Sequence, residues 1–592
     1  MKKMGLLRHL LGATAMTLAL GASTAALAAD PNKVLRLASF DIETLDPQRI
    51  NDDPSSQVAA AIFEGLYDWS YLGTPPHLVA VSASALPEIA DGGRTWTLRL
   101  QPGIRFTDDP AFGGQPRELV AEDIVYSMKR ALDPTLKRGG NAAVTDVIVG
   151  ARAVVETAEK AGRFDYDRTI EGLRAIDRHT IQIRLSHPNY PVIESFLTTA
   201  AVAREVITAA NGDARTRPVG TGPYRLREWL QGSRIVLDAN PYYRTIAFPT
   251  SNDPRDADLV RSMQGVALPQ IGVVEVNVID EELTRVLQFD RGRLDYVVLT
   301  GVAGARAVNG GKLRKEYTDR GVTRRAYPEP YVAALFFNMS DATIGGMDLA
   351  HIALRRAMAL AIDRDAWVDV VYAGQGSAAN QVVPPTVAGH IANLPKADHD
   401  PRLANALLDR FGYRKDGEGY RMTPDGKPLS IRVTLRIAPA TRDQQTLLKK
   451  NMDAIGIRLN FKVTLFQELL KESAAGAYQI NAFAMGGLPT AYGVTVQFYS
   501  RSPVTVNPTR FSMPRFDQAF ESYIGGGDDA AQAASVAAMN ALLQYYVPMV
   551  PLVFRTESEL VQPWLKGFAP PVFNSYFKYL DIDLDAQRAA SR

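Results

Sequence analysis

The sequence contains no cysteine among its 592 residues. This absence excludes disulfide bonds, thiolate metal sites and cysteine nucleophiles. It also excludes the lipid-modified cysteine that would tether a secreted bacterial protein to a membrane. A chain of this length without disulfides must be stabilised by its core alone, and we expect a freely diffusing protein.

Histidine is scarce as well, with seven in the whole chain. None of those that follow the first 28 residues has the H-x-H or H-E-x-x-H spacing of a metal-binding motif. The sequence therefore predicts no metal site and no cofactor, and a site assembled only in space stays an alternative. These histidines are His77, His179, His187, His351, His390 and His399.

Motifs of catalysis are missing too. There is no Walker A motif and no G-x-S-x-G, and the S-x-x-K match at Ser575 to Lys578 has no S-D-N or K-T-G partner. The adjacent acids Glu122-Asp123 and Glu281-Glu282 lie at predicted helix starts, where the helix dipole favours acids without any catalytic role. We predict no catalytic residue and do not expect an enzyme.

Long hydrophobic runs are absent after residue 28, and the first 28 residues have the pattern of a secretory signal peptide. Lys2, Lys3 and Arg8 precede an apolar run, and Ala26-Leu27-Ala28 offers small residues for cleavage. Removing this segment changes the formal charge from +2 to −1. A near-neutral chain with mixed charges gives no support for nucleic-acid binding.

The stretch from Val219 to Arg244 predicts a tight turn and then a two-stranded ribbon. Gly220 and Gly222 permit backbone conformations closed to larger residues, Pro223 restrains the turn, and we expect a β-branched residue in place of Gly222 to be strained, particularly if φ is positive there. Apolar residues then alternate with arginines, and Ile235 to Leu237 forms the second strand.

Further blocks follow along the chain in a specific order. They are Leu45-Asp46-Pro47, Phe63 to Tyr67 (FEGLY), Ala361-Ile362-Asp363-Arg364 and Trp564 to Phe568. Together with Gly-Thr-Gly-Pro-Tyr at 220–224, they closely resemble the family 5 extracellular solute-binding proteins of bacterial ABC importers, which include oligopeptide and dipeptide receptors. The resemblance covers nearly all of the chain after residue 28.

The resemblance implies an α/β protein with the two-lobed periplasmic-binding-protein type II fold and an extra subdomain in the first lobe. The expected boundaries are a signal peptide at 1–28, lobe one at 29–275 with the extra subdomain at about 68–210, lobe two at 276–549, and a return to lobe one at 550–592. The length alone also favours two or more lobes.

Local patterns predict several elements inside these lobes. Leu119 to Leu132 is expected to be a helix, and so is one long helix from Leu349 to Tyr372. The order strand, helix, strand is predicted at Ile431–Leu435, Arg442–Ile455 and Ile457–Val463.

The candidate binding residues come from the resemblance. Peptide-binding relatives anchor the ligand's amino group with an Asp just after the strand that here ends at Met485, but no Asp occurs from Tyr478 to Arg515. Gly486 and Gly487 replace it and offer backbone N–H donors. The resemblance also places Arg436 or Arg442 where a carboxylate or phosphate could be received, with solvated surface charge as the equal alternative. The complete candidate set is Phe40, Asp41, Thr44, Arg436, Arg442, Met485, Gly486, Gly487 and Tyr492.

The resemblance implies a function in transport. We expect a monomeric periplasmic protein that captures a peptide-like or other small organic solute between its lobes and delivers it to the permease subunits of an ABC transporter. Because the Asp is missing, free peptides should bind poorly, and blocked, acidic or apolar solutes better, unless an acid such as Asp41 or Glu43 takes over. A secreted hydrolase on the same scaffold and a ligand-presenting sensor or scaffold protein stay as alternatives.

Overall fold

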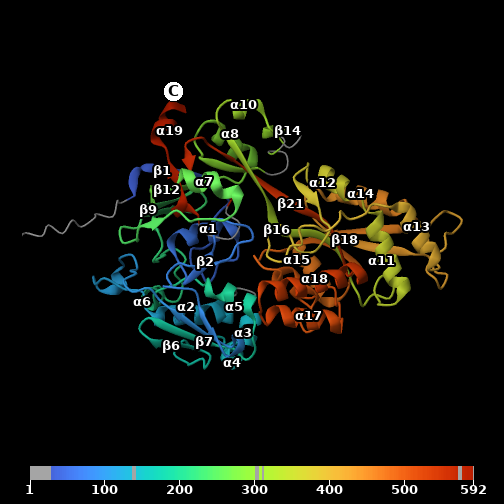
Figure 1. Ribbon diagram of the computed structural model, residues 1–592, viewed down its shortest axis with the longest axis horizontal. Helices are drawn as coiled ribbons and strands as arrows, with labels where there is room; N and C mark the ends of the chain where they lie inside the picture. Colours follow the sequence, from blue (N-terminus) through green and yellow to red (C-terminus); the bar gives the residue numbers. More distant parts are fainter. Residues whose placement is uncertain are drawn as a thin grey trace, which may run out of the picture.

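The computed structural model describes residues 29–136, 142–299, 304, 306–309, 312–570 and 576–590, so the predicted signal peptide at 1–28 lies outside the described residues. Figure 1 shows two bodies side by side, joined by two long strands, β16 (Thr323–Phe337) and β21 (Met549–Val561). Among the described residues, no helix is both long and apolar enough to cross a membrane.

The first lobe is built on a four-stranded sheet with the order β1-β12-β9-β8. β1 and β12 are parallel, and β9 pairs antiparallel with both β12 and β8. The predicted ribbon after Pro223 is the β8–β9 hairpin. The strands are β1 (Asp30–Ser39), β8 (Tyr224–Leu230), β9 (Arg234–Ala239) and β12 (Ile271–Val278), and α1 (Asp53–Ile62), α6 (Arg204–Ala209), α7 (Ala257–Ser262) and α19 (Leu584–Ala590) accompany them.

Gly222 is required by close packing and not by its backbone angle. Gly222 is not among the glycines with positive φ, so a positive φ is not what requires glycine at this position. A Cβ on Gly222 would lie 2.6 Å from the carbonyl carbon and oxygen of Ile62, and one on Gly220 would lie 2.0 Å from the same oxygen. The Gly222 N–H donates to Ile62 O at 2.9 Å. The two glycines thus let the turn lie directly against the end of α1.

A second sheet, β4-β5-β7-β6, forms a subdomain with a core of its own that includes Trp96, Leu98, Ile181 and Ile183. The predicted helix at 119–132 is α2, which packs against this sheet. The elements are β4 (Glu88–Ala90), β5 (Thr95–Arg99), β6 (Leu173–Asp177), β7 (Thr180–Arg184), α2 (Ala121–Leu132), α3 (Ala142–Val147), α4 (Ala151–Ala161) and α5 (Tyr190–Leu197).

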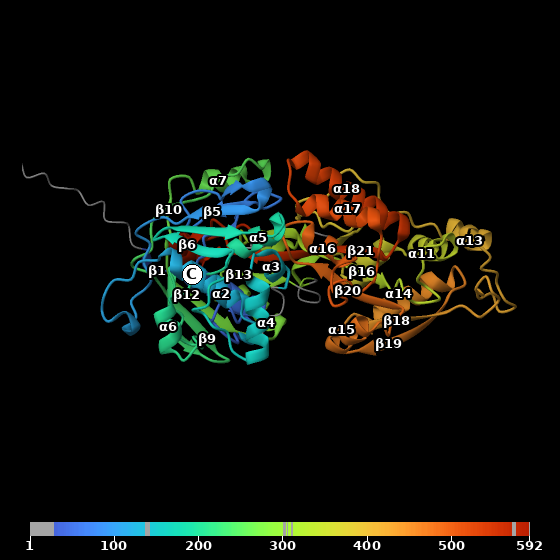
Figure 2. The same cartoon turned by 90° about the horizontal axis from the view of Figure 1, so that it is seen from below.

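The second lobe surrounds a mixed sheet with the order β13-β21-β16-β20-β18-β19, to which β17 adds at β21. The predicted strand–helix–strand unit is β18 (Ser430–Arg436), α14 (Thr441–Asp453) and β19 (Arg458–Thr464), with its two strands parallel. Figures 1 and 2 show the helices of this lobe on both faces of the sheet. The other elements are β17 (Gly376–Ala378), β20 (Ile480–Gly486), α13 (Pro401–Arg410), α15 (Phe466–Ala475), α16 (Tyr492–Thr495), α17 (Pro514–Ile524) and α18 (Asp529–Tyr546).

The single long helix predicted from Leu349 to Tyr372 is wrong. The structure has two helices, α11 (Leu349–Ala361) and α12 (Arg364–Val371). Asp363 is the cause, because it has an extended backbone and its side chain accepts from Ala366 N at 3.0 Å, which is an N-cap for a new helix.

The chain crosses between the lobes through β16 and β21. The elements α8 (Glu282–Asp290), β13 (Tyr296–Leu299) and α10 (Lys315–Thr318) lie beside the first lobe, and β13 pairs with the first-lobe end of β21. Asp295 accepts from Arg36 N at 2.6 Å and from Trp564 Nε1 at 2.7 Å. The lobe boundaries stay a prediction, but these contacts favour a start of the second lobe at β16 and not at residue 276.

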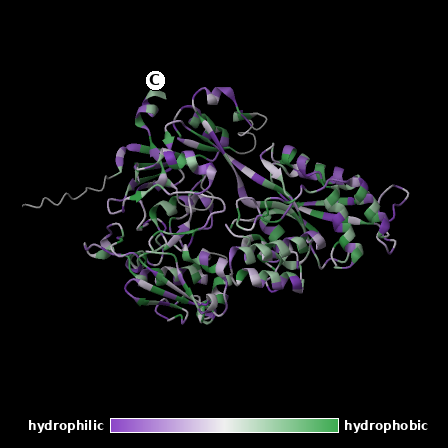
Figure 3. Cartoon of the chain, viewed as in Figure 1, coloured by the Kyte–Doolittle hydropathy of each residue, from purple (hydrophilic) through white to green (hydrophobic). Residues whose placement is uncertain are grey.

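The two crossing strands change character along their length. Figure 3 shows their first-lobe parts as largely hydrophilic and their second-lobe parts as hydrophobic. The ladder between them has a register shift between Pro328 and Val332, where Pro328 and Pro330 have no N–H to donate. The pairing is therefore interrupted where the ribbon passes from one lobe to the other.

Candidate ligand-binding site

A cavity of about 1280 Å³ lies between the lobes, and the crossing strands form one of its walls. Residues of the first lobe such as Phe40, Asp53 and Trp69 line it, together with Arg436 and Phe466 of the second lobe. A ligand in this cavity would contact both lobes at once.

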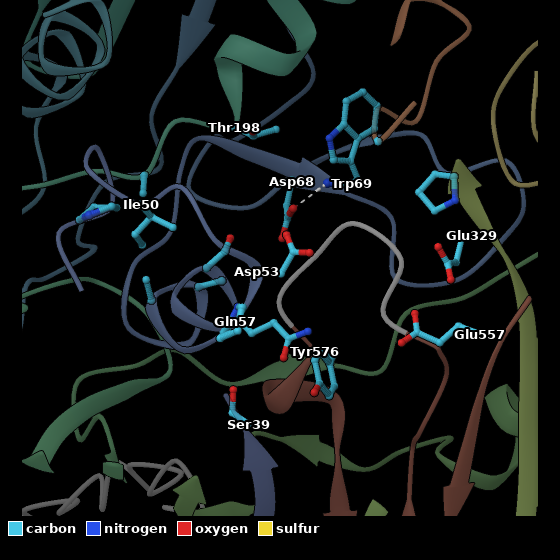
Figure 4. Close-up of a pocket in the computed structure, with 18 of the residues that line it drawn as sticks. Ser39, Ile50, Asp53, Gln57, Asp68, Trp69, Thr198, Glu329, Glu557 and Tyr576 are labelled. Atoms are coloured by element: carbon cyan, nitrogen blue, oxygen red, sulfur yellow. Dashed lines mark hydrogen bonds between the residues drawn. The ribbon is translucent and has the colours of Figure 1, made fainter. Parts of the chain in front are cut away.

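Carboxylates converge on this cavity from several elements (Figure 4). Asp53 is placed at the start of α1, where the side chain of Asp52 caps the helix by accepting from Ser55 N at 2.7 Å. Glu329 lies between the two prolines of β16, and Glu557 and Glu559 alternate along β21 and so share one face. All four carboxylates line the cavity.

Two of these acids have partners within the wall. Glu329 forms an ion pair with Arg555. Tyr327 lies opposite Glu557 on β16, and its hydroxyl donates to Glu557 Oε2 at 3.0 Å. Burial raises the pKa of Glu557, and the nearby Glu329 raises it further. Burial also raises the pKa of Glu329, although Arg555 lowers it in part.

Glu559 is the most buried of the four acids, at 2% exposed. Its Oε2 atom has no hydrogen-bond partner in the part of the chain that the structure describes. Burial, and after it the charge of Glu557, raises the pKa of Glu559 well above its ordinary value. A buried polar atom without a partner costs free energy, so this carboxyl is a candidate for contact with a ligand.

A further acid of the cavity, Glu64, belongs to a closed ion-pair network. It accepts from Lys578 at 3.0 Å, Arg244 at 2.9 Å and Tyr243 at 2.7 Å. Burial alone would raise the pKa of Glu64, but Lys578 and Arg244 hold it below its ordinary value. This FEGLY glutamate therefore joins the first lobe to the C-terminal segment, and its charge is already balanced.

Three of the nine predicted site residues line the cavity: Phe40, Arg436 and Gly487. The Phe40 ring is 49% exposed, and the guanidinium of Arg285 lies 4.0 Å from its centroid. The prediction that Gly487 offers a free N–H is wrong, because this group donates to Pro330 O at 2.9 Å. Both glycines have positive φ and lie against β16, so they were needed for close approach of two strands.

The other six do not line the cavity. Met485 is buried in the second-lobe core, Arg442 is exposed on α14, and Tyr492 packs against Phe520. Asp41 accepts from Ile42 N and Gly232 N, and it serves a turn. The remaining two are Thr44, which is buried and accepts from Asp46 N, and Gly486.

The acids of the crossing strands are not among the predicted site residues. The available signal was the alternation Glu557-Ser558-Glu559 directly after the apolar run that ends at Phe554, because two acids on one strand face rarely lie there without a partner or a ligand. Among the described residues, no group of three or more His, Cys, Asp or Glu side chains is placed to hold a metal ion.

An interlobe cavity with walls from two α/β bodies defines a class of two-lobed ligand-binding proteins. The chain belongs to the bacterial extracellular solute-binding proteins, family 5, whose family model matches residues 77–505. This is a binding family of ABC importers and not a family of enzymes.

Individual relatives are distant. The periplasmic oligopeptide-binding protein OppA of Salmonella typhimurium is 25% identical over 601 residues, covering 98% of this chain and 97% of its own. The probable deoxycholate-binding periplasmic protein YgiS of Escherichia coli is 28% identical over 397 residues, covering 65% and 64%. The structure of HbpA2 from Haemophilus parasuis has 17% identity and a TM-score of 0.72, covering 93% of this chain and 100% of its own. The predicted α/β fold of a periplasmic binding protein is confirmed.

Proposed function

We propose that this protein captures a small organic solute in the cavity between its lobes and presents it to the permease subunits of an ABC importer. The observation that carries the proposal is the cavity of about 1280 Å³ whose wall is the pair of crossing strands. A solute that contacts both walls stabilises a closed arrangement more than an open one.

The crossing strands have the features of a hinge. The ladder between β16 and β21 is interrupted at Pro328 and Pro330, and it resumes at Val332 with a second register shift between Ala333 and Ala334. Interrupted pairing lets the two ends of a ribbon change their relative angle at low cost. The proposed motion moves Arg436 and Phe466 of the second lobe toward Phe40 and Asp53 of the first.

The family does not fix the solute. The names of the two relatives above refer to oligopeptides and to deoxycholate, which have little chemistry in common. In this chain we propose that Arg436, exposed on β18 at the cavity, receives an anionic group of the solute. The usual anchoring of a peptide amino group after Met485 has no counterpart here.

The proposed location is the periplasm, as a monomer without a lipid anchor. The relative OppA is named periplasmic. The sequence has a signal-peptide pattern at 1–28 and no cysteine to carry a lipid.

The test is mass spectrometry of solutes released by denaturing the purified protein, followed by scattering measurements on refolded, ligand-free protein. We expect a stoichiometric small molecule, and a smaller radius of gyration when it is added back. An unchanged scattering profile at saturating solute would contradict the proposed closure. Arg436→Gln should weaken the binding of an anionic solute. Arg442→Gln, at an exposed position outside the cavity, is the matched control and should leave that binding unchanged.

A further inference from the structure

We infer that Glu557 and Glu559, together with the tyrosines beside them, form a subsite for an organic cation, either an ammonium or a guanidinium group. This inference rests on the proposed function, because it names the chemistry of a solute bound in the same cavity.

The first argument is the uneven balance of charge around the cavity. Of the lining residues that the structure describes, seven are acids and four are cations. Two of these cations already form ion pairs within the protein, Lys578 with Glu64 and Arg555 with Glu329. Neither Glu557 nor Glu559 forms an ion pair among the described residues. The charge of Arg555 acts on Glu557, but Arg555 is already paired with Glu329, so a positive group of the solute would supply the missing counter-charge.

The second argument is the position of Glu559 itself. It is 98% buried and yet lines the cavity, and its Oε2 is unpartnered among the described residues. Its cross-strand neighbour on β16 is Arg325, which is exposed, and no ion pair joins these two side chains. Its neighbour on β13 is the apolar Val298. Nothing in the two adjacent strands balances a carboxylate here.

The third argument is the aromatic wall. Tyr296, Tyr327 and Tyr576 line the cavity, and the charge of Glu559 acts on all three. The Tyr296 and Tyr576 rings meet edge to face, with centroids 6.1 Å apart, and their hydroxyls are in contact. Tyrosine faces beside a carboxylate attract cations, and they suit ammonium groups in particular.

The inference changes one expectation drawn from the sequence. Poor binding of free amino groups was expected because the loop after Met485 has no Asp. The crossing strands supply two acids in its place, Glu557 and Glu559, both on β21. We therefore expect a cationic group to be bound, at Glu557 and Glu559.

The experiment uses refolded, ligand-free full-length protein and two matched probe sets. One set contains organic cations, namely choline, cadaverine and butylguanidine, and the other contains neutral isosteres such as 3,3-dimethylbutanol and pentanol. Binding is measured by calorimetry and by thermal shift at pH 7.5. The variants are Glu557→Gln, Glu559→Gln and both together, and the control is Glu156→Gln, an exposed acid on α4 away from the cavity.

We expect at least one cation to bind and its neutral isostere not to bind. Each glutamine variant should lower the affinity for that cation about tenfold or more, while Glu156→Gln should leave the affinity unchanged. The inference is overturned if no cation binds, if cation and isostere bind equally, or if the double variant binds the cation as the wild type does.

The failure of this inference is distinguishable from failure of the proposed function. An anionic or neutral solute that is found by mass spectrometry and reduces the radius of gyration would refute the cation subsite and leave capture between the lobes intact. If no solute of any kind changes the radius, the proposed function fails as well.

Discussion

Tyr190 of the extra subdomain lies directly over Gly526 of the second lobe. A Cβ on Gly526 would lie 2.4 Å from Cε2 of the Tyr190 ring. Both cartoon views place α5, which begins at Tyr190, beside α17 of the second lobe, and Figure 2 also shows α16 next to it (Figures 1 and 2). The two lobes are thus in contact away from the crossing strands as well as through them.

This contact predicts that Gly526→Val separates the lobes at this point. The new side chain would collide with Tyr190, so the ligand-free protein should have a larger radius of gyration and weaker solute binding. Gly526 also has a φ of +83°, so backbone strain of about 1–3 kcal/mol is expected in addition. Scattering and calorimetry are the measurements.

Gly212→Val is the matched control for strain. Gly212 has the same φ of +83°, and nothing lies within 4 Å of its Cβ position. It should lower the melting temperature without changing the radius. If Gly526→Val behaves like this control in scattering, the Tyr190 contact does not set the separation of the lobes.

Gly222→Val is expected to destabilise the fold through a collision with α1. Its Cβ would lie 2.6 Å from the backbone of Ile62. Overpacking of this kind costs about 1–3 kcal/mol, so the melting temperature should fall by several degrees. Gly417→Val is the control, because its φ is not positive and nothing lies within 4 Å of its Cβ position. Equal melting temperatures for the two variants would show that the turn can move away from α1.

Local elements of this protein could be predicted from sequence better than the cavity could. The unit β18–α14–β19 was predicted to within two residues at each end, because its apolar pattern is a local signal. The break at Asp363 was missed because an apolar stripe continues on both sides of it. Local patterns thus identify an element more reliably than they locate its interruptions.

The cavity could not be predicted because its walls come from segments hundreds of residues apart. Asp53 on α1 and Glu557 on β21 meet only through the tertiary packing of the first lobe against the crossing strands. The resemblance placed Asp41 and Met485 near a ligand, but a turn and a core position hold them instead. Alternation along β21 places Glu557 and Glu559 on one face of the strand, but the sequence does not tell which face borders the cavity.

Glu559→Gln is expected to stabilise the ligand-free protein above acidic pH. Burial raises the pKa of Glu559 in the folded state. Between a pH of about 4.5 and this raised pKa, the carboxyl is protonated in the folded state and ionised in the unfolded state. Because the folded state then holds more protons, the free energy of unfolding falls as pH rises through this window. Glutamine cannot ionise and removes that loss.

Thermal unfolding from pH 4 to pH 9 measures the effect. The melting temperature of the variant should exceed that of the wild type by a margin that grows with pH, whereas Glu156→Gln should show no such growth. Each unit of pKa shift corresponds to about 1.4 kcal/mol. A margin that is constant with pH would mean that Glu559 is not a protonated, unpaired carboxyl in the ligand-free protein.

The final prediction concerns how cation binding depends on pH. The groups that face Glu557 and Glu559 are Glu329, Arg555 and Tyr327 on the crossing strands, the exposed Arg325 across from Glu559, Asp53 on α1, and Tyr71, Tyr296 and Tyr576. Burial raises the pKa of both acids, so both hold protons in the empty cavity above their ordinary range. A bound cation favours their ionised forms and lowers the pKa of each. Binding therefore releases protons, and the affinity for a cation should rise with pH until both acids are ionised without ligand, by up to about tenfold per pH unit for each proton released.

Calorimetry in two buffers of different ionisation enthalpy counts the protons: the wild type should release more than Glu559→Gln, and the double variant Glu557→Gln/Glu559→Gln should release none from this site. A cation affinity that is independent of pH, with no difference between the buffers, would show that the positive group of the solute is bound elsewhere in the cavity.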